Sequence, residues 1–503
     1  MNGNASPSTK AQWLALKETL HIENRPFING CYQSVEALES IKVVNPADGS
    51  CITEVFACGQ AALERAVLAA RESFDSGVWS SLPPVERKKR LLALSRLIYR
   101  HRDELALLES LDMGKPVRDS LNLDMNRAVE CFAWHAEAID KFYDQMAPLS
   151  ENYLGLIRHE PIGVVAAIVP WNFPLVMASW KVAPALATGN SVILKPSERS
   201  MLTALRLAGL AKEAGIPDGV FQVLPGFGYT LGKAMALHND IDCLVFTGST
   251  ATGKLLLQYA GQSNMKKVYL ECGGKSPHLI FDDGVDIDKA ALTAARAIFF
   301  NQGEVCVAGS RLLLQKSIKE AVLERVLQHA ASMKAGDPLE MTSFMGALVD
   351  EAHLKRVLQY IESGICEGAK LLCGGQQVYQ DSGGYFVNPT VFDDVTPQMT
   401  IFQEEIFGPV LSVCSFDDED EALRLANNSC FGLAAGVWTA DMRRANRLSR
   451  KLRAGTVWIN SWSGGDMTMP FGGFKQSGNG RDRSLQAMAK YTETKAVWYD
   501  FTD

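Results

Sequence analysis

Short apolar segments that alternate with helical segments are the feature that most constrains the fold of this chain. From residue 163 onward, GVVAAIVP, NSVILKPS, FQVLPG and CLVFTGS are short apolar runs, and each ends in Gly, Pro or Ser. Helical stretches such as MLTALRLAGLAKEAG and TLGKAMALH lie between them. Strand, turn, helix and strand in succession predict a parallel sheet with helices on both of its faces.

A second series of the same kind follows LECGGKSPHLIFDD. Helical IDKAALTAARAIFF comes first, then strand-like RLLLQ, helical IKEAVLERVLQHAASM, and later GPVLSVCSF, LAAGVWT and GTVWIN. A single hydrophobic core stops growing near ~250–300 residues. We therefore expect this chain of 503 residues to form at least two α/β lobes, with a boundary near residues 273–274.

Three further segments show a clear periodicity or a strongly apolar composition. Residues 59–78 and 84–111 have apolar residues at three- and four-residue spacing, which predicts amphipathic helices. Pro84 suits the first turn of the second helix. The C-terminal AVWYDF is β-like and apolar, so it is expected to join a sheet, and the edge of another subunit is one possible partner.

Charge and cysteine usage exclude several functional classes. The net charge of -7 is spread along the chain without a Lys/Arg block, so nucleic acid is not an expected partner. The N-terminus lacks a signal-peptide pattern, and the longest apolar runs fall short of the ~20 residues that span a bilayer. The 11 cysteines include no CxxC pair. This distribution favours reduced thiols in a cytoplasmic protein without a metal site.

Two turns between a strand and a helix are candidate nucleotide sites. LPGFGYTLGKA places Gly228 between two other glycines, but the third glycine comes one residue late for GxGxxG. In FTGSTATGK, Ser249 and Thr250 follow a strand at an expected helix start, where backbone N–H groups attract phosphate. A tight turn and an ordinary capped helix explain the two segments equally well.

A lysine and a carboxylate follow a third strand, in VILKPSERS. Ligands of open parallel sheets bind beyond the carboxyl ends of the strands. Lys195 and Glu198 are therefore suited to the hydroxyls of a ribose, although a solvated surface pair is the simpler alternative.

One cysteine stands in a glycine-flanked loop, FFNQGEVCVAG. Cys306 is either a small buried hydrophobe or a nucleophile, and a nucleophile usually needs a base. Nothing in the sequence recommends His329 or His353 as that base. A carboxylate is the other possibility, and Glu271 ends a strand before two glycines while Glu304 is nearer in sequence. The residues alone leave these alternatives open.

Seven motifs in fixed order carry a resemblance that covers nearly the whole chain. They are PWNFP (170–174), KPSE (195–198), FTGST (246–250), LECGGKSP (270–277), FNQGEVCVAGSR (300–311), EEIFGPV (404–410) and PFGGFKQSGNGR (470–481). In identity, order and spacing they resemble the motif series of the aldehyde dehydrogenase superfamily. The resemblance implies two Rossmann-like doubly wound α/β lobes with a small β extension that joins subunits.

The resemblance also implies catalytic roles for three residues. Cys306 matches the nucleophile that attacks the aldehyde carbon, which gives a thiohemiacetal and, after loss of hydride, a thioester. Asn172 matches the amide that holds the developing oxyanion together with the backbone N–H of Cys306. Glu271 matches the base that activates water to hydrolyse the thioester. Cys272, which follows it, stands where many members have leucine, and we interpret it as a change in packing.

The cofactor implied by the resemblance is NAD. Lys195 and Glu198 match residues at the adenosine ribose, and Ser249 matches the helix start at the pyrophosphate. A carboxylate at position 198 repels a 2′-phosphate, so NAD is expected to be preferred over NADP. The complete set of predicted cofactor residues is Trp171, Lys195, Glu198, Gly228, Ser249, Glu405 and Phe407.

The substrate is predicted from the aromatic positions and from the branch of the family. Phe173, Trp180 and Phe471 match residues of the substrate tunnel, although they equally suit a packed core. LDMGKPVRDSLNLD and GGDMTMPFGGFKQSGNGRD resemble the branch that oxidises aminoaldehydes from polyamine or arginine breakdown, such as γ-glutamyl-γ-aminobutyraldehyde or 4-guanidinobutyraldehyde. Asp124 and Asp466 are candidate partners for a cationic substrate end, or simply surface residues.

Several rival functions remain as alternatives. A dehydrogenase that transfers the acyl group to coenzyme A does not need Glu271. A general aliphatic or semialdehyde dehydrogenase is closer, and a semialdehyde enzyme needs an arginine in the tunnel. A catalytically silent NAD-binding homologue does not need Cys306, Asn172 and Glu271 together.

The resemblance finally implies domain limits and an assembly. We predict an NAD-binding domain at residues 1–138 and 162–273, a catalytic domain at 274–475, and an oligomerisation extension at 139–161 and 485–503. The expected assembly is a cytoplasmic homo-oligomer, a dimer or a tetramer, with a small aldehyde as its other partner.

Overall fold

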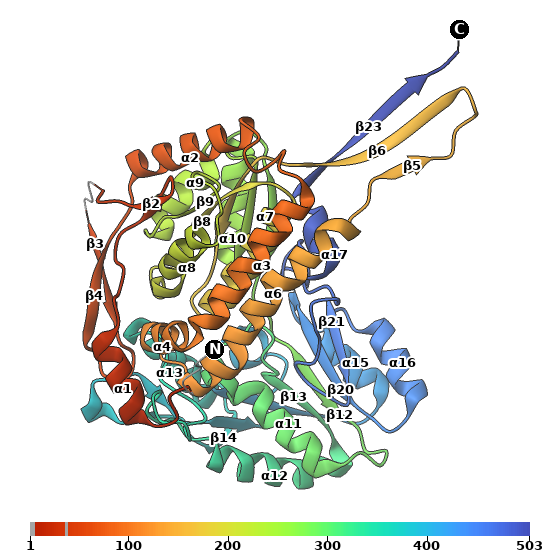
Figure 1. Ribbon diagram of the computed structural model, residues 1–503. Coiled ribbons are helices and arrows are strands. Elements are labelled where there is room, and N and C mark those ends of the chain that lie inside the picture. Colours follow the sequence, from red (N-terminus) through yellow and green to blue (C-terminus); the bar gives the residue numbers. More distant parts are fainter. Residues whose placement is uncertain (1–5, 36–38, 503) are drawn as a thin grey trace.

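The first lobe is built on a mostly parallel sheet. The computed structural model describes residues 6–35 and 39–502 (Figure 1). Within them, one seven-stranded sheet has the order β11-β10-β7-β8-β9-β1-β2. The first five of these strands run parallel, and β1 pairs antiparallel with β9 on one side and with β2 on the other. Their bounds are Lys267–Glu271, Cys243–Thr247, Val164–Ile168, Ser191–Lys195, Phe221–Val223, Phe27–Ile28 and Cys31–Tyr32.

The central strand β7 is buried on both faces, as its unbroken apolar sequence predicts. Alternate side chains point to opposite faces of a strand. Val165 and Ala167 therefore pack in a core with α3, α6, α7 and α8, whereas Val164 and Ala166 pack in a core with α2, α9 and α10. These helices are Pro84–Arg100, Met125–Ala138, Pro174–Ala187, Leu202–Glu213, Gln60–Asp75, Lys233–Leu237 and Thr250–Gln262. The predicted two-sided sheet is confirmed.

The helix predicted at residues 84–111 is two helices in the structure. Pro84 opens α3 as expected, but the chain turns at His101, whose ψ of 17° is not helical. A second helix, α4, then runs over Arg102–Met113. Apolar periodicity continues through the turn because both helices bury residues in the same core, and periodicity alone therefore could not locate the break.

The second lobe is also built on a mostly parallel sheet with helices on both faces. Its seven-stranded sheet, within the same described ranges, has the order β14-β17-β18-β13-β12-β20-β21, and only β14 is antiparallel. The strands are Lys370–Cys373, Thr390–Asp393, Val410–Phe416, Arg311–Gln315, Pro277–Ile280, Ala434–Trp438 and Thr456–Ile459. Helices α11 (Ile287–Phe299) and α12 (Lys319–Ser332) cover one face. Helices α13 (Glu351–Cys366), α15 (Glu419–Asn427) and α16 (Met442–Lys451) cover the other.

A three-stranded antiparallel sheet projects away from both lobes (Figure 1). It consists of β23 (Thr492–Asp500), β6 (Tyr153–Pro161) and β5 (Gln145–Ala147), with β6 in the middle. The expected C-terminal strand is thus present, and its sheet partner is β6 of the same chain. No helix among the described residues is long and apolar enough to cross a membrane.

Candidate active site

A cavity of about 1220 Å³ brings together the carboxyl edge of the first sheet and loops of the second lobe. Strands β7, β8 and β10 run parallel in register, so Ile168, Lys195 and Thr247 meet at one edge of the sheet. The predicted site residues that line this cavity are Trp171, Asn172, Phe173, Trp180, Lys195, Glu198, Gly228, Ser249, Cys306, Glu405, Phe407, Asp466 and Phe471. Glu271 and Asp124 do not line it.

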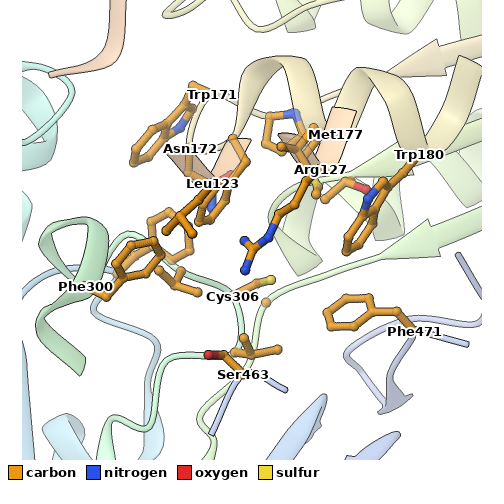
Figure 2. Close-up of a pocket in the computed structure, with 18 of the residues that line it drawn as sticks. Leu123, Arg127, Trp171, Asn172, Met177, Trp180, Phe300, Cys306, Ser463 and Phe471 are labelled. Atoms are coloured by element: carbon orange, nitrogen blue, oxygen red, sulfur yellow. The ribbon is translucent and has the colours of Figure 1, made fainter. Parts of the chain in front are cut away.

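Cys306 lies at the cavity in a loop with an unusual backbone. After α11, Asn301 and Gln302 adopt φ values of 51° and 56°, and Gly303 follows at 74°. Such values are uncommon for residues other than glycine and indicate that the surroundings fix the loop. Asn301 and Gln302 are buried, and the Gln302 Oε1 accepts a hydrogen bond from the backbone N–H of Gly346 at 2.9 Å. The loop therefore presents the partly exposed Cys306 to the cavity (Figure 2).

Glu304, the carboxylate nearest to Cys306 in sequence, belongs to this scaffold. Its Oε1 accepts from the backbone N–H of Val349 at 3.0 Å, and its Oε2 accepts from Gln302 Nε2 at 3.3 Å. Burial raises the pKa of the Glu304 carboxyl well above its ordinary value. The side chain is fully buried and does not line the cavity, so its role is to position the loop.

The electrostatic surroundings of Cys306 favour the thiol. Burial raises its pKa to about 12, and the charges of Glu405 and Glu271 act in the same direction. The backbone N–H groups of Val307 and Cys306 oppose these effects by stabilising the thiolate. Formation of the thiolate therefore requires a proton acceptor or additional positive charge at the cavity.

Asn172 joins the first lobe to the Cys306 loop. It stands two residues before α7, and its Nδ2 donates to the backbone carbonyl of Glu304 at 2.8 Å. The backbone carbonyl of Asn172 accepts from Lys115 Nζ at 3.1 Å and from Asn301 Nδ2 at 3.2 Å. An amide nitrogen carries two hydrogens, and the second is available to an oxygen bound beside Cys306.

Glu271 ends β11 and lies behind the cavity wall, close to Gly472. Neither of its carboxylate oxygens has a hydrogen-bond partner among the described residues. Burial raises the pKa of this carboxyl well above its ordinary value, and the negative charge of Asp482 adds to the effect. An unpartnered buried carboxyl with a raised pKa is suited to accept a proton during a reaction.

A buried charge cluster lies next to Glu271, and sequence reasoning missed it. Asp482 binds Lys181 Nζ at 2.5 Å and also pairs with Lys490, and all three side chains are buried. Burial raises the pKa of Asp482, but the two lysines outweigh this effect and the pKa is lowered. The only signal in the sequence was that Asp482 directly follows the last of the seven motifs.

The nucleotide side of the cavity has groups that fit a dinucleotide. Lys195 Nζ is buried and donates to Glu198 Oε2 at 3.3 Å and to the carbonyl of Pro196 at 3.1 Å, which leaves a third hydrogen free. Ser249 caps α10, whose N-terminus borders the cavity. A Cβ placed on Gly228 would meet nothing within 4 Å, so that side of the cavity is open. A cation, a carboxylate and a helix N-terminus match ribose hydroxyls and a pyrophosphate.

Two other predicted cofactor residues lie further along the same side. Glu405 Oε1 accepts from the backbone N–H of Gly274 at 2.9 Å, and burial raises its pKa to about 7. The rings of Phe407 and Trp171 meet edge to face at 5.3 Å. These contacts fix the wall between the nucleotide side and the Cys306 loop.

Aromatic side chains line the opposite end of the cavity (Figure 2). Trp180 and Phe471 meet edge to face at 5.1 Å, and Phe173 stacks on Phe300 at 6.3 Å. Asp466 is exposed and accepts hydrogen bonds from its neighbour Thr468. The prediction that Asp124 contacts the substrate is not supported. Asp124 is buried and pairs with Lys115, because it lies on the inner face of its helix.

Cys272 is compatible with the predicted change in packing. Its side chain is buried, and burial raises the pKa of its thiol to about 12. A Cβ on Gly253 of α10 would approach the Cys272 sulfur at 3.1 Å, so the two elements are closely packed here.

The chain belongs to the aldehyde dehydrogenase family, because residues 32–497 match that family's model. It is 50% identical over 489 residues to the NADP/NAD-dependent aldehyde dehydrogenase PuuC of Escherichia coli (strain K12). The aligned region is 97% of this chain and 98% of PuuC. A solved γ-glutamyl-γ-aminobutyraldehyde dehydrogenase of Burkholderia cenocepacia J2315 superimposes with a TM-score of 0.96 at 52% identity, over 98% and 100% of the two chains.

A third relative has been solved with its ligands. A mutant of the indole-3-acetaldehyde dehydrogenase AldA of P. syringae, in complex with NAD+ and IAA, gives a TM-score of 0.97 at 53% identity, over 98% and 100% of the two chains. The predictions of the family, of the α/β fold class, of an aldehyde-oxidising enzyme and of its cofactor NAD are confirmed. The chain is an aldehyde dehydrogenase, and the silent homologue is not favoured.

Proposed function

We propose that this protein uses NAD to oxidise an aldehyde that comes from polyamine or arginine breakdown, and that the product is a free carboxylic acid. The observation that carries the proposal is one continuous cavity, which joins the nucleotide side, Cys306 and the aromatic end. The names of PuuC and of the γ-glutamyl-γ-aminobutyraldehyde dehydrogenase support an aminoaldehyde or its derivative. A general aliphatic aldehyde is the competing substrate, because Phe173, Trp180 and Phe471 are apolar.

The first step is addition of Cys306 to the aldehyde. The Cys306 thiol gives its proton to water, the resulting thiolate sulfur forms a bond to the carbonyl carbon, and the π electrons of the carbonyl move to its oxygen. Asn172 Nδ2 and the backbone N–H of Cys306 donate to this oxyanion, and such donors are each worth roughly 3–4 kcal/mol in comparable sites. Because the side-chain amide and the cysteine loop are held together through the carbonyl of Glu304, the donors are fixed before the substrate arrives.

NAD would supply the ring that accepts the hydride from the former aldehyde carbon. Lys195 and Glu198 would hold the adenosine ribose, Ser249 at the start of α10 would face the pyrophosphate, and Glu405 and Phe407 would hold the nicotinamide ribose. The carboxylate of Glu198 repels an additional phosphate on the 2′-hydroxyl. NAD is therefore preferred over NADP.

Hydrolysis of the Cys306 thioester completes the reaction. Glu271 takes a proton from water, whose oxygen attacks the thioester carbon, and the C–S bond breaks as the acid leaves. Because the pKa of Glu271 is raised, this carboxyl ionises at a higher pH than an ordinary carboxyl does. Glu271 does not line the cavity, so its side chain must rotate toward Cys306 or act through a water molecule.

We further propose that the projecting sheet joins subunits. Trp498 on β23 is 65% exposed and Phe501 beyond it is 60% exposed, which is unusual for residues of this size. The outer edge of β23 also has hydrogen-bonding groups that another chain can pair with. Light scattering of Trp498→Asp should report a smaller assembly than the unchanged protein. The predicted domain limits, the homotetramer and the cytoplasmic location stay predictions.

The test of the enzymatic proposal is NADH formation with a panel of aldehydes. The panel contains propanal, hexanal, 4-aminobutanal, 4-guanidinobutanal and γ-glutamyl-4-aminobutanal. We expect one of the nitrogen-containing compounds to give the highest kcat/KM and Cys306→Ala to form no NADH. A preference for hexanal would refute the proposed substrate class, and full activity of Cys306→Ala would refute the nucleophile.

A further inference from the structure

Two arginines line the aromatic end of the cavity, although no motif contains them. Arg127 lies on α6, and its guanidinium points into the cavity among Met177, Trp180 and Cys306 (Figure 2). Among residues 6–35 and 39–502, this guanidinium has no ion pair and no hydrogen bond. An unpaired guanidinium in a cavity is available to bind a ligand.

Arg483 lines the same cavity. Its Cζ lies 4.6 Å from the centre of the Trp180 ring and 5.1 Å from that of Phe471, and its Nε is buried without a hydrogen-bond partner. Its backbone φ is 58°, which L-residues adopt at a cost in energy. Burial lowers the pKa of Arg483, and the charge of Arg127 lowers it further, so the two cations are close enough to interact.

The acidic residues that line the cavity form no ion pair with Arg127 or Arg483 among the described residues. Asp119 binds Arg118 Nε at 2.9 Å, and Asp466 uses its carboxylate to accept from Thr468. Glu130 lines the cavity and, like Arg127, is exposed, and it forms no ion pair with either arginine. Arg296 and Lys289 at the same cavity add further positive charge. The cavity therefore contains two arginines, Arg127 and Arg483, that have no ion pair among the described residues.

We propose that Arg127 and Arg483 bind a carboxylate at the far end of the aldehyde substrate, an inference that rests on the proposed function. A guanidinium presents parallel N–H groups that match the two oxygens of a carboxylate. The faces of Trp180 and Phe471 hold Arg483 in place, and its Nη1 donates to the backbone carbonyl of Asp466 at 3.5 Å, while its Nε has no partner among the described residues. The same charges repel a free ammonium or guanidinium end.

The proposal separates the members of the aldehyde panel. In 4-aminobutanal and 4-guanidinobutanal the far end is cationic, so the two arginines disfavour these compounds. In γ-glutamyl-4-aminobutanal the amide nitrogen is uncharged, and the far end is a zwitterion whose carboxylate shares one carbon with an ammonium group. Succinic semialdehyde carries a carboxylate on a shorter chain. Comparison of these two compounds shows how far from Cys306 the carboxylate binds.

The experiment compares substrates of nearly equal shape that either carry or lack a carboxylate at the far end. KM and kcat are measured for γ-glutamyl-4-aminobutanal, for its analogue with a carboxamide in place of the carboxylate, for succinic semialdehyde and for 4-aminobutanal. The proteins are the unchanged enzyme, Arg127→Gln, Arg483→Gln, the double variant, and Arg127→Lys and Arg483→Lys. Arg118→Gln is the matched control, because Arg118 lines the same cavity but is already paired with Asp119.

For each Gln variant we expect the KM for the carboxylate substrate to rise about ten- to a hundred-fold, the usual value of a hydrogen bond to a charged group. The kcat should change little, and the KM for the carboxamide analogue should rise much less. The Lys variants should restore part of the affinity, because they keep the charge. Arg118→Gln should shift the KM by less than about threefold, as expected for a charge that is already paired near the surface.

Three outcomes would overturn the inference or its basis. Equal losses for the carboxylate and the carboxamide would mean that the arginines act by packing, and the inference would fail. A preference of the unchanged enzyme for 4-aminobutanal over γ-glutamyl-4-aminobutanal would also reject it, while the proposed function would stand. Absence of NADH from every aldehyde would instead reject the proposed function. Melting curves identify any Gln variant that is misfolded. For that position, the KM values of the Lys variant for the carboxylate and the carboxamide then test whether the arginine binds the carboxylate.

Discussion

Replacement of Asn172 by alanine separates its chemical role from its structural role. The side-chain Nδ2 carries two hydrogens, and one of them is used in the 2.8 Å bond to the carbonyl of Glu304. The substitution removes the other hydrogen from the oxyanion. Loss of one such donor costs ~3–4 kcal/mol of transition-state stabilisation, so kcat/KM should fall by about 10²–10³-fold.

The same substitution should destabilise the fold only slightly. The carbonyl of Glu304 keeps a second donor, Asn301 Nδ2 at 3.2 Å. The backbone carbonyl of Asn172 does not depend on its side chain, and it keeps both Lys115 and Asn301 as donors. The lost hydrogen bond is therefore worth roughly 0.5–1.5 kcal/mol of unfolding free energy. The loss in activity should greatly exceed the loss in stability.

The assay measures NADH formation at saturating NAD together with thermal melting of the same preparation. Asn172→Asp is the matched variant, since it keeps the size of the side chain but places a negative charge where the oxyanion forms. We expect it to be at least as inactive as the alanine variant. If Asn172→Ala folded normally and kept kcat/KM within about tenfold of the unchanged enzyme, a smaller loss than any single oxyanion donor gives, the assignment would be refuted.

Three further predictions concern the base, the ribose carboxylate and the buried charge cluster. Glu271→Gln should keep the first burst of NADH but lower the steady-state rate about 10²–10⁴-fold, the contribution of a general base. In the unchanged enzyme the steady-state rate should rise with pH as Glu271 ionises through its raised pKa, because only the carboxylate accepts a proton. An identical pH profile in Glu271→Gln would argue against Glu271 as the general base. Glu198→Gln should lower the KM for NADP relative to that for NAD, since repulsion of the 2′-phosphate is removed, and an unchanged ratio would contradict it. Asp482→Asn should lower the free energy of unfolding by ~3–5 kcal/mol, because Lys181 and Lys490 are left buried without a counter-charge. In the unchanged protein the stability that the ionised Asp482 contributes is present above the ordinary carboxyl pKa of 3.8 and is lost as pH falls below it, because the pKa of Asp482 is lowered in the folded state. Urea unfolding that differs by less than ~1 kcal/mol between Asp482→Asn and the unchanged protein would count against the cluster.

Residues at the ends of strands were predictable from the sequence because the strands themselves were. An unbroken apolar run such as that of β7 predicts a strand buried on both faces, and parallel strands place their carboxyl ends at one edge. Lys195 and Ser249 were therefore expected at one edge of the sheet, although the residues alone left open whether they bind a nucleotide. The partner of the C-terminal strand could not be identified in this way, because its partner β6 lies more than 300 residues earlier in the chain.

The charges around the substrate could not be predicted because a local irregularity decides which side of α6 faces the cavity. A π-helical turn over Ser120–Asp124 precedes that helix, and one such turn shifts the phase of every following residue. As a result Asp124 turns inward to Lys115, whereas Arg127, three residues later, reaches the cavity. In the sequence both are polar residues of one helix, and the choice of Asp124 implied a cationic substrate. In the structure Arg127, and not Asp124, reaches the cavity, so the charge there is positive and a carboxylate on the substrate is the more favourable ligand.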